Sequence, residues 1–309
     1  MKGMFMPVKK FLSLLLTVLF ICSSGLNVRG SEKPAFNKSD DINDFFADYS
    51  LIPPPDPIYL PIIMYHQISQ KPSRLGTYII SPDEFESDLK LYKEQGFTAV
   101  TVSDLIKYAT KKAILPQKPI MLTFDDGNES DFIYALPLLK KYGMKAIFSV
   151  VGKFVDDYSK PDIIRNIDYA MLSWDEIKEM YESGLADFQN HSYNMHNHSS
   201  RNGALPRRFE GEEEYSKAIK NDLGRLNAEF RERMGKEPEA FTAPFGCFND
   251  RVKEAVRKAG FPVIFTSYQK MNILTGDPEE LLFLKRYLRT HNKDMQSLIK
   301  SWDEYYNGS

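Results

Sequence analysis

The order of local patterns along this chain predicts an α/β fold in which parallel strands form a barrel or a sheet. Short apolar runs of strand length alternate with segments that carry helix-start and helix-stop signals, which is typical of repeated β-α units. The polar residues that could carry chemistry fall directly after several of these apolar runs. In an α/β barrel the carboxyl ends of the strands converge on one face, so residues far apart in the sequence can meet there.

Residues 1–25 have the pattern of an export signal or an N-terminal anchor. Lysines precede an apolar run over residues 11–22, which is shorter than the ~20 residues that a membrane span needs. Cys22 lies where a lipoprotein signal would place its cysteine, but the bulky Ile21 before it argues against lipidation. We therefore expect a secreted or cell-surface protein, peripheral to the membrane or cell wall, with this segment either cleaved or retained as an anchor.

Residues 26–57 are polar and end in Pro53-Pro54-Pro55-Asp56-Pro57, which predicts an extended linker. The remaining residues, 58–309, are enough for one large domain with its own core, which we expect to be monomeric. Cys247 is the one cysteine beyond the N-terminal segment, so we expect no intrachain disulfide there. The formal net charge of −2 gives no reason to expect a nucleic-acid partner.

Each element has a local signal in the sequence. The helices begin at capping residues, two of them in capping boxes, and several end at a glycine. The predicted strands are Ile58–Tyr65, Phe97–Val102, Pro119–Phe124, Lys145–Val151, Leu185–Gln189, Ala240–Pro244, Val263–Ser267 and Leu281–Leu288. The predicted helices run from Ser81 to Gly96, from Ser103 onward, over Asp131–Tyr142, from Ser173 to Gly184, over Glu212–Met234, from Asn249 to Gly260 and over Asp294–Tyr305.

Two adjacent carboxylates, Asp125 and Asp126, follow the predicted strand Pro119–Phe124. Holding a carboxylate near a dry core is costly, and two side by side repel each other unless a cation is present. Two histidines, His191 and His196, follow the predicted strand Leu185–Gln189. One Asp and two His can bind Zn²⁺ or a similar ion while leaving positions open for water and substrate. The other Asp could then act as a base, which together predicts metal-assisted hydrolysis of an amide or ester.

Each of these residues can also be explained by a purely structural role. An isolated Asp-Asp-Gly is more often a turn than a metal site. His191 alone could cap a strand end, and a histidine near an apolar run, such as His66, could simply be part of the core. The combination of a carboxylate pair with a histidine pair, each following a strand, favours the metal site.

Three motifs of the sequence resemble those of the polysaccharide deacetylases, the NodB-like family of carbohydrate esterases. Thr123-Phe124-Asp125-Asp126-Gly127 resembles the first motif, His191 through His196 the second, and Thr242-Ala243-Pro244-Phe245-Gly246 the third. The resemblance extends from about Pro61 to the C-terminal region. It implies a distorted (β/α) barrel of the NodB type and a divalent metal cofactor, with zinc expected.

The resemblance also implies roles for the matched residues. Asp125 would be the general base, and Asp126, His191 and His196 would be the metal ligands. A wall of the substrate groove, where the backbone N–H of Phe245 helps to hold the oxyanion, would be formed by Pro244, Phe245 and Gly246.

The sequence departs from the family pattern at three places. The second histidine comes five residues after His191 rather than four, a spacing found in the branch that deacetylates poly-N-acetylglucosamine, and His198 is an alternative ligand. The third motif often begins with an arginine that orients the base, but Thr242 stands there. The late Leu-x-His motif has only a loose match, which ends at His291, whereas Ile63-Met64-Tyr65-His66 resembles an early motif of the same branch. We therefore prefer His66 over His291 as the general acid.

The expected function is removal of N-acetyl groups from an amino-sugar polysaccharide, for which poly-N-acetylglucosamine, peptidoglycan and chitin-like chains are all candidates. The alternatives are a catalytically impaired carbohydrate-binding relative and an O-acetyl esterase acting on another polysaccharide. A glycosidase is not expected, because its two carboxyl groups must flank the scissile bond at least ~5 Å apart. Adjacent residues such as Asp125 and Asp126 are poorly placed for that.

Overall fold

The computed structural model describes residues 57–198 and 201–306, which belong to one compact unit, Lys38–Ser309. The predicted N-terminal segment, 1–25, and nearly all of the predicted linker, 26–57, lie outside the described residues. Within the described ranges, none of the helices combines the length and the apolar character that crossing a membrane requires.

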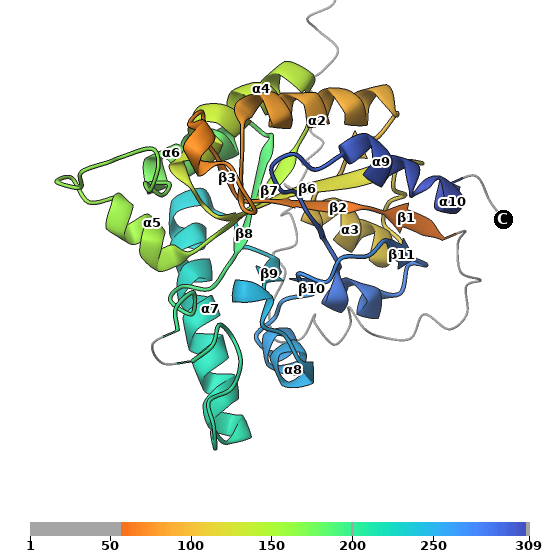
Figure 1. Cartoon of the computed structure of the whole chain (residues 1–309). Coiled ribbons are helices and arrows are strands. Elements are labelled where there is room, and N and C mark those ends of the chain that lie inside the picture. Colours follow the sequence, from red (N-terminus) through yellow and green to blue (C-terminus); the bar gives the residue numbers. More distant parts are fainter. Residues whose placement is uncertain (1–56, 199–200, 307–309) are drawn as a thin grey trace, which may run out of the picture. The chain divides into compact units, whose positions relative to one another are not determined.

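A curled parallel sheet forms the centre of the fold (Figure 1). Its strands lie in the order β10-β9-β8-β7-β6-β2-β12, and the short β5 pairs with the first residues of β6. The strands are β2 (Ile62–Tyr65), β5 (Thr98–Ala99), β6 (Pro119–Asp126), β7 (Ala146–Val150), β8 (Ala186–Asn190), β9 (Ala240–Thr242), β10 (Val263–Phe265) and β12 (Tyr287–Leu288).

One segment near the C-terminus, residues 284–289, contacts both edges of this sheet. At its beginning, Leu284 donates its N–H to Ile264 O of β10 (2.9 Å), and its carbonyl accepts from Thr266 N (2.8 Å). At its end, Tyr287 pairs with Ile63 of β2, and Arg289 N donates to Met64 O (2.9 Å). The sheet therefore curls round on itself, which confirms the predicted distorted barrel.

Two small sheets lie outside this curl. β1 (Ile58–Leu60) pairs antiparallel with β11 (Asn272–Leu274), and β3 (Gln67–Ile68) pairs parallel with β4 (Ile79–Ile80). The predicted strand Ile58–Tyr65 is thus divided at Pro61, where β1 ends and β2 begins.

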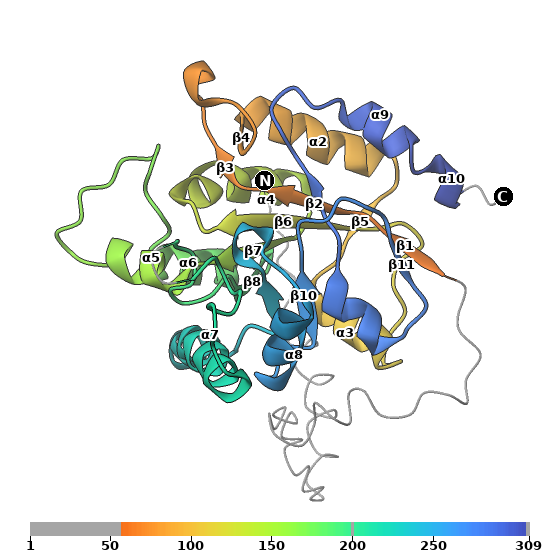
Figure 2. The ribbon, with the colours of Figure 1, turned by 60° about the horizontal axis from the view of Figure 1, so that its bottom comes forward.

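Helices surround the sheet, with α2 and α4 on one side and α7 and α8 on the other (Figure 2). The α-helices are α2 (Pro82–Glu94), α3 (Val102–Ala109), α4 (Leu136–Tyr142), α5 (Gly152–Tyr158), α6 (Trp174–Glu182), α7 (Glu212–Met234), α8 (Asp250–Lys258), α9 (Met295–Lys300) and α10 (Asp303–Tyr306). A π-helical turn precedes α4, and short 3₁₀ helices occupy Pro72–Arg74, Pro244–Gly246 and Pro278–Phe283. Both predicted capping boxes are present, at Ser81 with Glu84 and at Ser173 with Glu176.

Several predicted strands were longer than the observed ones, and two of them differ most. Phe97–Val102 is reduced to β5, because Thr101 and Asp104 form a further capping box that starts α3 at Val102. Leu281–Leu288 is a strand only at Tyr287–Leu288, because Asp277 caps a 3₁₀ helix in which Pro278 is the first residue.

Alternation along β6 decides which side chains face the barrel interior. Phe124 stacks between Tyr65 and Phe148, with ring centroids 5.0 Å apart on each side, in the core that also contains residues of α2, α4 and α6. Successive strand residues point to opposite faces, so Thr123 and Asp125 point into the barrel. The apolar stack thus fixes the direction of the buried carboxylate.

Candidate active site

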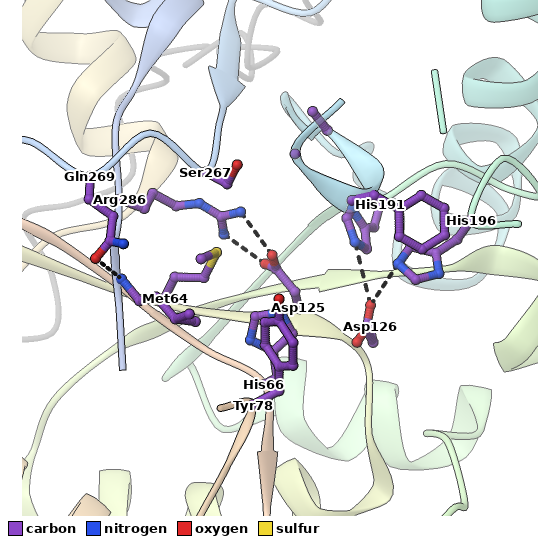
Figure 3. A pocket seen from close by; sticks show the side chains of 14 residues that line it. Met64, His66, Tyr78, Asp125, Asp126, His191, His196, Ser267, Gln269 and Arg286 are labelled. Carbon is purple, nitrogen blue, oxygen red and sulfur yellow. Dashed lines mark hydrogen bonds and ion pairs between the residues drawn. The ribbon is translucent and has the colours of Figure 1, made fainter. Parts of the chain in front are cut away.

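Most of the sequence-predicted site residues converge on one cavity of about 540 Å³ at the carboxyl ends of the strands (Figure 3). Its lining comes from β2, β6 and β12, from the segments after β8, β9 and β10, and from the loop that carries Tyr78. The residues that line it are Met64, His66, Tyr78, Asp125, Asp126, His191, His196, Ala243, Phe245, Gly246, Ser267, Gln269, Arg286 and Leu288. Pro244, predicted as part of the groove wall, is buried and does not line it.

A left-handed turn ends β6 and separates the two carboxylates. Asp126 has φ 77° and Gly127 has φ 78°. A Cβ on Gly127 would lie 2.8 Å from Cγ1 of Val150, so only glycine fits there without displacing β7. The left-handed conformation at Asp126 is strained, and strain of this kind is concentrated at functional sites. It leaves Asp125 inside the barrel and turns Asp126 toward the two histidines.

Asp126, His191 and His196 form a compact cluster whose ligand atoms all lie within 4.8 Å of one another. Asp126 Oδ1 is 3.5 Å from His191 Nε2 and 3.2 Å from His196 Nε2. Ligand atoms at ~2.0–2.1 Å from a tetrahedral zinc ion lie about 3.3 Å apart, so these separations fit a shared metal. His191 Nδ1 lies 2.8 Å from Thr242 O, and donation of the ring N–H to that carbonyl leaves Nε2 free as a ligand.

The charge of Asp126 is set by the same histidines. Burial by itself would raise the pKa of this carboxyl, but the electrostatic interactions with His191 and His196 hold the pKa below its ordinary value. The carboxylate is therefore ionised, as a metal ligand must be.

Asp125 is held by an arginine that the sequence did not reveal. Arg286 makes a bidentate ion pair with it, from Nη1 to Oδ1 at 2.7 Å and from Nη2 to Oδ2 at 2.8 Å. Arg286 is itself fixed by Thr123 Oγ1 (3.1 Å) and by the carbonyl oxygen of Thr266 (2.9 Å). Burial would raise the pKa of Asp125, but the guanidinium outweighs burial and lowers that pKa.

The position where the family's third motif often has an arginine serves another purpose in this chain. The Thr242 carbonyl orients His191, and the Thr242 hydroxyl shares a 2.7 Å hydrogen bond with Ser149 Oγ. The arginine that pairs with Asp125 is instead Arg286, in the predicted strand Leu281–Leu288. The sequence signal that could have revealed it is a charged residue within an apolar run. Because a buried arginine needs an anionic partner, an arginine in an apolar strand predicts an acidic residue beside it in the fold.

The two candidate acids lie in different places. His66 lines the cavity, its ring centroid is 4.8 Å from that of Tyr78, and its buried Nδ1 has no hydrogen-bond partner among the described residues. Burial lowers the pKa of His66, although Asp125 and Asp126 oppose this shift. His291 does not line the cavity, and its Nδ1 lies 2.9 Å from Glu84 Oε2 on α2.

The turn at Pro244–Gly246 forms another part of the wall. Phe245 is 42% exposed and adopts φ 57°, and Gly246 follows with φ 64°. A Cβ on Gly246 would lie 1.9 Å from Ser267 Oγ, so the turn packs tightly against the segment after β10. His198 stands outside the metal cluster and stacks on Phe245, with ring centroids 4.1 Å apart.

Comparison with known proteins agrees with this arrangement. The family model described as polysaccharide deacetylase matches residues 112–264. The chain is 28% identical over 233 residues to a poly-β-1,6-N-acetyl-D-glucosamine N-deacetylase of Staphylococcus aureus (strain MRSA252). The aligned region covers 75% of this chain and 74% of that protein. A protein of the same name from Staphylococcus epidermidis is 27% identical over 232 residues.

Solved structures have the same fold. IcaB from Ammonifex degensii matches with a TM-score of 0.62 and 26% identity, over 82% of this chain and 97% of that one. A de-N-acetylase from Aggregatibacter actinomycetemcomitans matches with a TM-score of 0.67 and 24% identity, over 78% of this chain and 99% of that one. With the barrel, the cavity and the motif residues in place, residues 112–264 are identified as a polysaccharide deacetylase domain.

Proposed function

We propose that this protein is a metal-dependent hydrolase that removes N-acetyl groups from an amino-sugar polymer outside the cytoplasm. The observation that most directly supports the proposal is that one cavity contains both a candidate base and a candidate metal-binding cluster. An arginine-held carboxylate, Asp125, lies beside a compact ligand set made of Asp126, His191 and His196. We further propose that the protein works as a monomer, secreted or attached at the cell surface through its N-terminal segment.

The residues present fit a divalent metal ion, and their nitrogen and oxygen donors suit zinc. In this mechanism Asp126, His191 and His196 would hold the ion. A cation bound there would supply Lewis acidity, which polarises an amide carbonyl and makes a water molecule more acidic.

Asp125 would accept the proton of the attacking water. Its lowered pKa keeps it ionised at neutral pH, and the bidentate pair with Arg286 fixes the direction of its carboxylate. The backbone N–H of Phe245 would stabilise the negative charge that develops on the amide oxygen.

His66 would donate the proton that the departing amine takes up. It lines the same cavity, and Tyr78 lies against its ring. Since burial lowers the pKa of His66, its protonated form is scarce above neutral pH. Activity that depends on this form is expected to decline as the pH rises.

We propose β-1,6-linked poly-N-acetylglucosamine as the first substrate to test, because relatives named for that polymer align with three quarters of the chain. Acetate release would be measured on this polymer, on peptidoglycan, on a chitin oligomer and on an O-acetylated xylan. Release should be abolished by a chelator and restored by added zinc. Unchanged release in excess chelator would refute the metal dependence, and release only from the xylan would favour the esterase.

Two substitutions separate the roles of the adjacent carboxylates. Asp125→Asn should abolish acetate release while the protein still binds zinc, whereas Asp126→Asn should lose both. Zinc content after dialysis and acetate release would be measured on the same preparations. Substantial acetate release by Asp125→Asn would contradict its role as the base.

A further inference from the structure

The backbone of Phe245 has a conformation that needs support. Its φ of 57° and ψ of 14° lie in the left-handed region, which is unfavourable for a bulky side chain. The ring is also 42% exposed, so burial in the core does not hold it. The amides of Gly246 and Cys247 are used inside the turn, bonded to Ala243 O and Pro244 O at 3.0 Å each.

Two histidine rings contact Phe245. The His198 ring stacks on it with a centroid distance of 4.1 Å and an interplanar angle of 18°, and the His196 ring lies 4.3 Å away at 41°. His198 is fixed in turn by Asn202, whose Oδ1 lies 3.1 Å from His198 Nδ1. Phe245 thus lies against both a proposed metal ligand and a second histidine from the same loop.

Backbone packing joins the same two regions. Gly203 has φ 57°, and a Cβ there would lie 2.7 Å from Pro244 O and 3.3 Å from Cys247 Cβ. The chain at Gly203 is therefore pressed against the turn that carries Phe245. A glycine at this position allows the close approach.

We propose that His198 is a positioning residue that clamps Phe245 by ring stacking. The clamp holds the turn in its left-handed conformation and links it to the loop that supplies His191 and His196. It keeps the Phe245 N–H directed at the developing oxyanion, and this part of the inference rests on the proposed function. Because His198 lies outside the metal cluster, it acts through its ring face, and its nitrogen atoms serve only to hold it in place.

Two variants of His198 separate the effect of ring stacking from the chemistry of the imidazole nitrogens. His198→Phe retains an aromatic face of similar size but has no nitrogen that could bind a metal or transfer a proton. His198→Ala removes the ring. We expect His198→Ala to lower kcat by about 10- to 100-fold, less than the roughly 10²–10³-fold loss on removing an oxyanion donor, because here the donor is displaced and not removed. His198→Phe should restore kcat to within a few fold, with KM and zinc content unchanged in both variants.

Amide hydrogen exchange gives a readout that does not depend on catalysis. The peptide containing Phe245 should exchange faster in His198→Ala than in the wild type, and at the wild-type rate in His198→Phe. This result would support the clamp even if the wild type released no acetate, in which case only the proposed function would fail. Equal exchange in all three proteins, or equal loss of kcat in both variants, would overturn the clamp. Loss of zinc from His198→Phe would instead make His198 a ligand, and a rise in KM alone would make it a sugar contact.

Discussion

Arg286 and Asp125 form a fully buried ion pair whose side chains are 1% and 5% exposed. A buried charge is costly unless it is paired with good geometry, so each residue requires the other. The pair also makes Asp125 a weaker base than a free aspartate, because its pKa is lowered. If Asp125 is the base, as we propose, accurate direction of its carboxylate would have to compensate for the lost basicity.

Replacing Arg286 tests whether direction matters as well as charge. Arg286→Lys keeps a cation but loses the planar two-point contact, so Asp125 can rotate. We expect kcat to fall on the order of 10²-fold, the usual cost of a reacting group misplaced by about 1 Å. Acetate release and zinc content would be measured for Arg286→Lys, for Asp125→Asn and for the double variant. Independent, additive losses in the double variant would contradict a shared role.

The choice between the two candidate acids is also decided by single residues. His66→Ala should lose most acetate release, because His66 lines the cavity, whereas His291→Ala should keep it, because His291 contacts Glu84 on α2. General acid catalysis contributes about 10²–10⁴-fold, which sets the size of the expected loss. Both variants would be assayed on one acetylated oligosaccharide. A larger loss in His291→Ala would reverse the assignment.

At the scale of elements, local sequence signals predicted where helices and strands begin and end better than they predicted which strands pair. The capping boxes at Ser81 and Ser173 and the strand Pro119–Phe124 were confirmed because the residues that define them are neighbours in the chain. The β1–β11 pair was missed, since the two strands are distant in sequence and both are short. The predicted strand Leu281–Leu288 was wrong over its first half, where Asp277 and Pro278 start a 3₁₀ helix.

The tight turn after β9 should tolerate only glycine at position 246. Gly246→Ala would place a Cβ 1.9 Å from Ser267 Oγ at a φ of 64°, so the turn must move. We expect the free energy of unfolding to drop by about 1–3 kcal/mol, together with a loss of acetate release. Gly76→Ala is the control, because open space surrounds Gly76, and its effect should stay within about 0.5 kcal/mol. Urea unfolding would compare the two variants, and equal stability would argue against a strained turn.

Glu84 joins α2 to the C-terminal segment, and its ionisation should make the free energy of unfolding depend on pH. Burial alone would raise its pKa, but the Ser81 amide, His291, the Asn292 amide and Arg289 together lower the pKa of Glu84 to about 2. The folded state therefore favours the ionised form relative to the ordinary value of 4.5. Its stabilising contribution is complete above pH 4.5 and is lost as the pH falls from there toward about 2.

Glu84→Gln should accordingly show a smaller loss of unfolding free energy than the wild type across that pH range. The control is Glu94→Gln, at the end of the same helix, where the glutamate makes a 3.8 Å exposed pair with Lys90. Urea unfolding at several pH values would measure the difference. Parallel pH profiles for the wild type and Glu84→Gln would rule out this linkage.

For the whole molecule, the sequence predicted the class of fold and the residues that gather at its strand ends. It did so because alternation of strands and helices is a repeated local pattern, and because strand ends meet in a barrel. It could not predict which arginine orients Asp125, since that contact depends on how the sheet closes. Arg286 and Asp125 are 161 positions apart, and only the curl of the sheet brings them together.

The predicted start of the large domain can be tested by truncation. A chain that begins at Pro57 keeps β1, and it should unfold cooperatively and release acetate as the full-length protein does. A chain that begins at Pro61 loses β1, including the buried Leu60, whose carbonyl accepts from Asn272 Nδ2 at 3.1 Å. We expect it to be less stable by about 2–5 kcal/mol, the usual cost of losing a buried leucine. Failure of the longer chain to fold would place the boundary upstream of Pro57.

The segment that curls the sheet onto itself is also among the last parts of the domain to be synthesised. Tyr287 and Leu288 pair with β2, near the start of the domain, and Arg286 precedes them directly. A ribosome releases β2, β6 and β8 long before this segment, so Asp126, His191 and His196 are synthesised while Asp125 still has no cation beside it. Contacts between distant segments form late in folding, because the loop they close must be ordered first. The Arg286–Asp125 pair is therefore among the last contacts to form, and a chain cut short before Arg286 would carry the proposed ligand residues without the cation that orients Asp125.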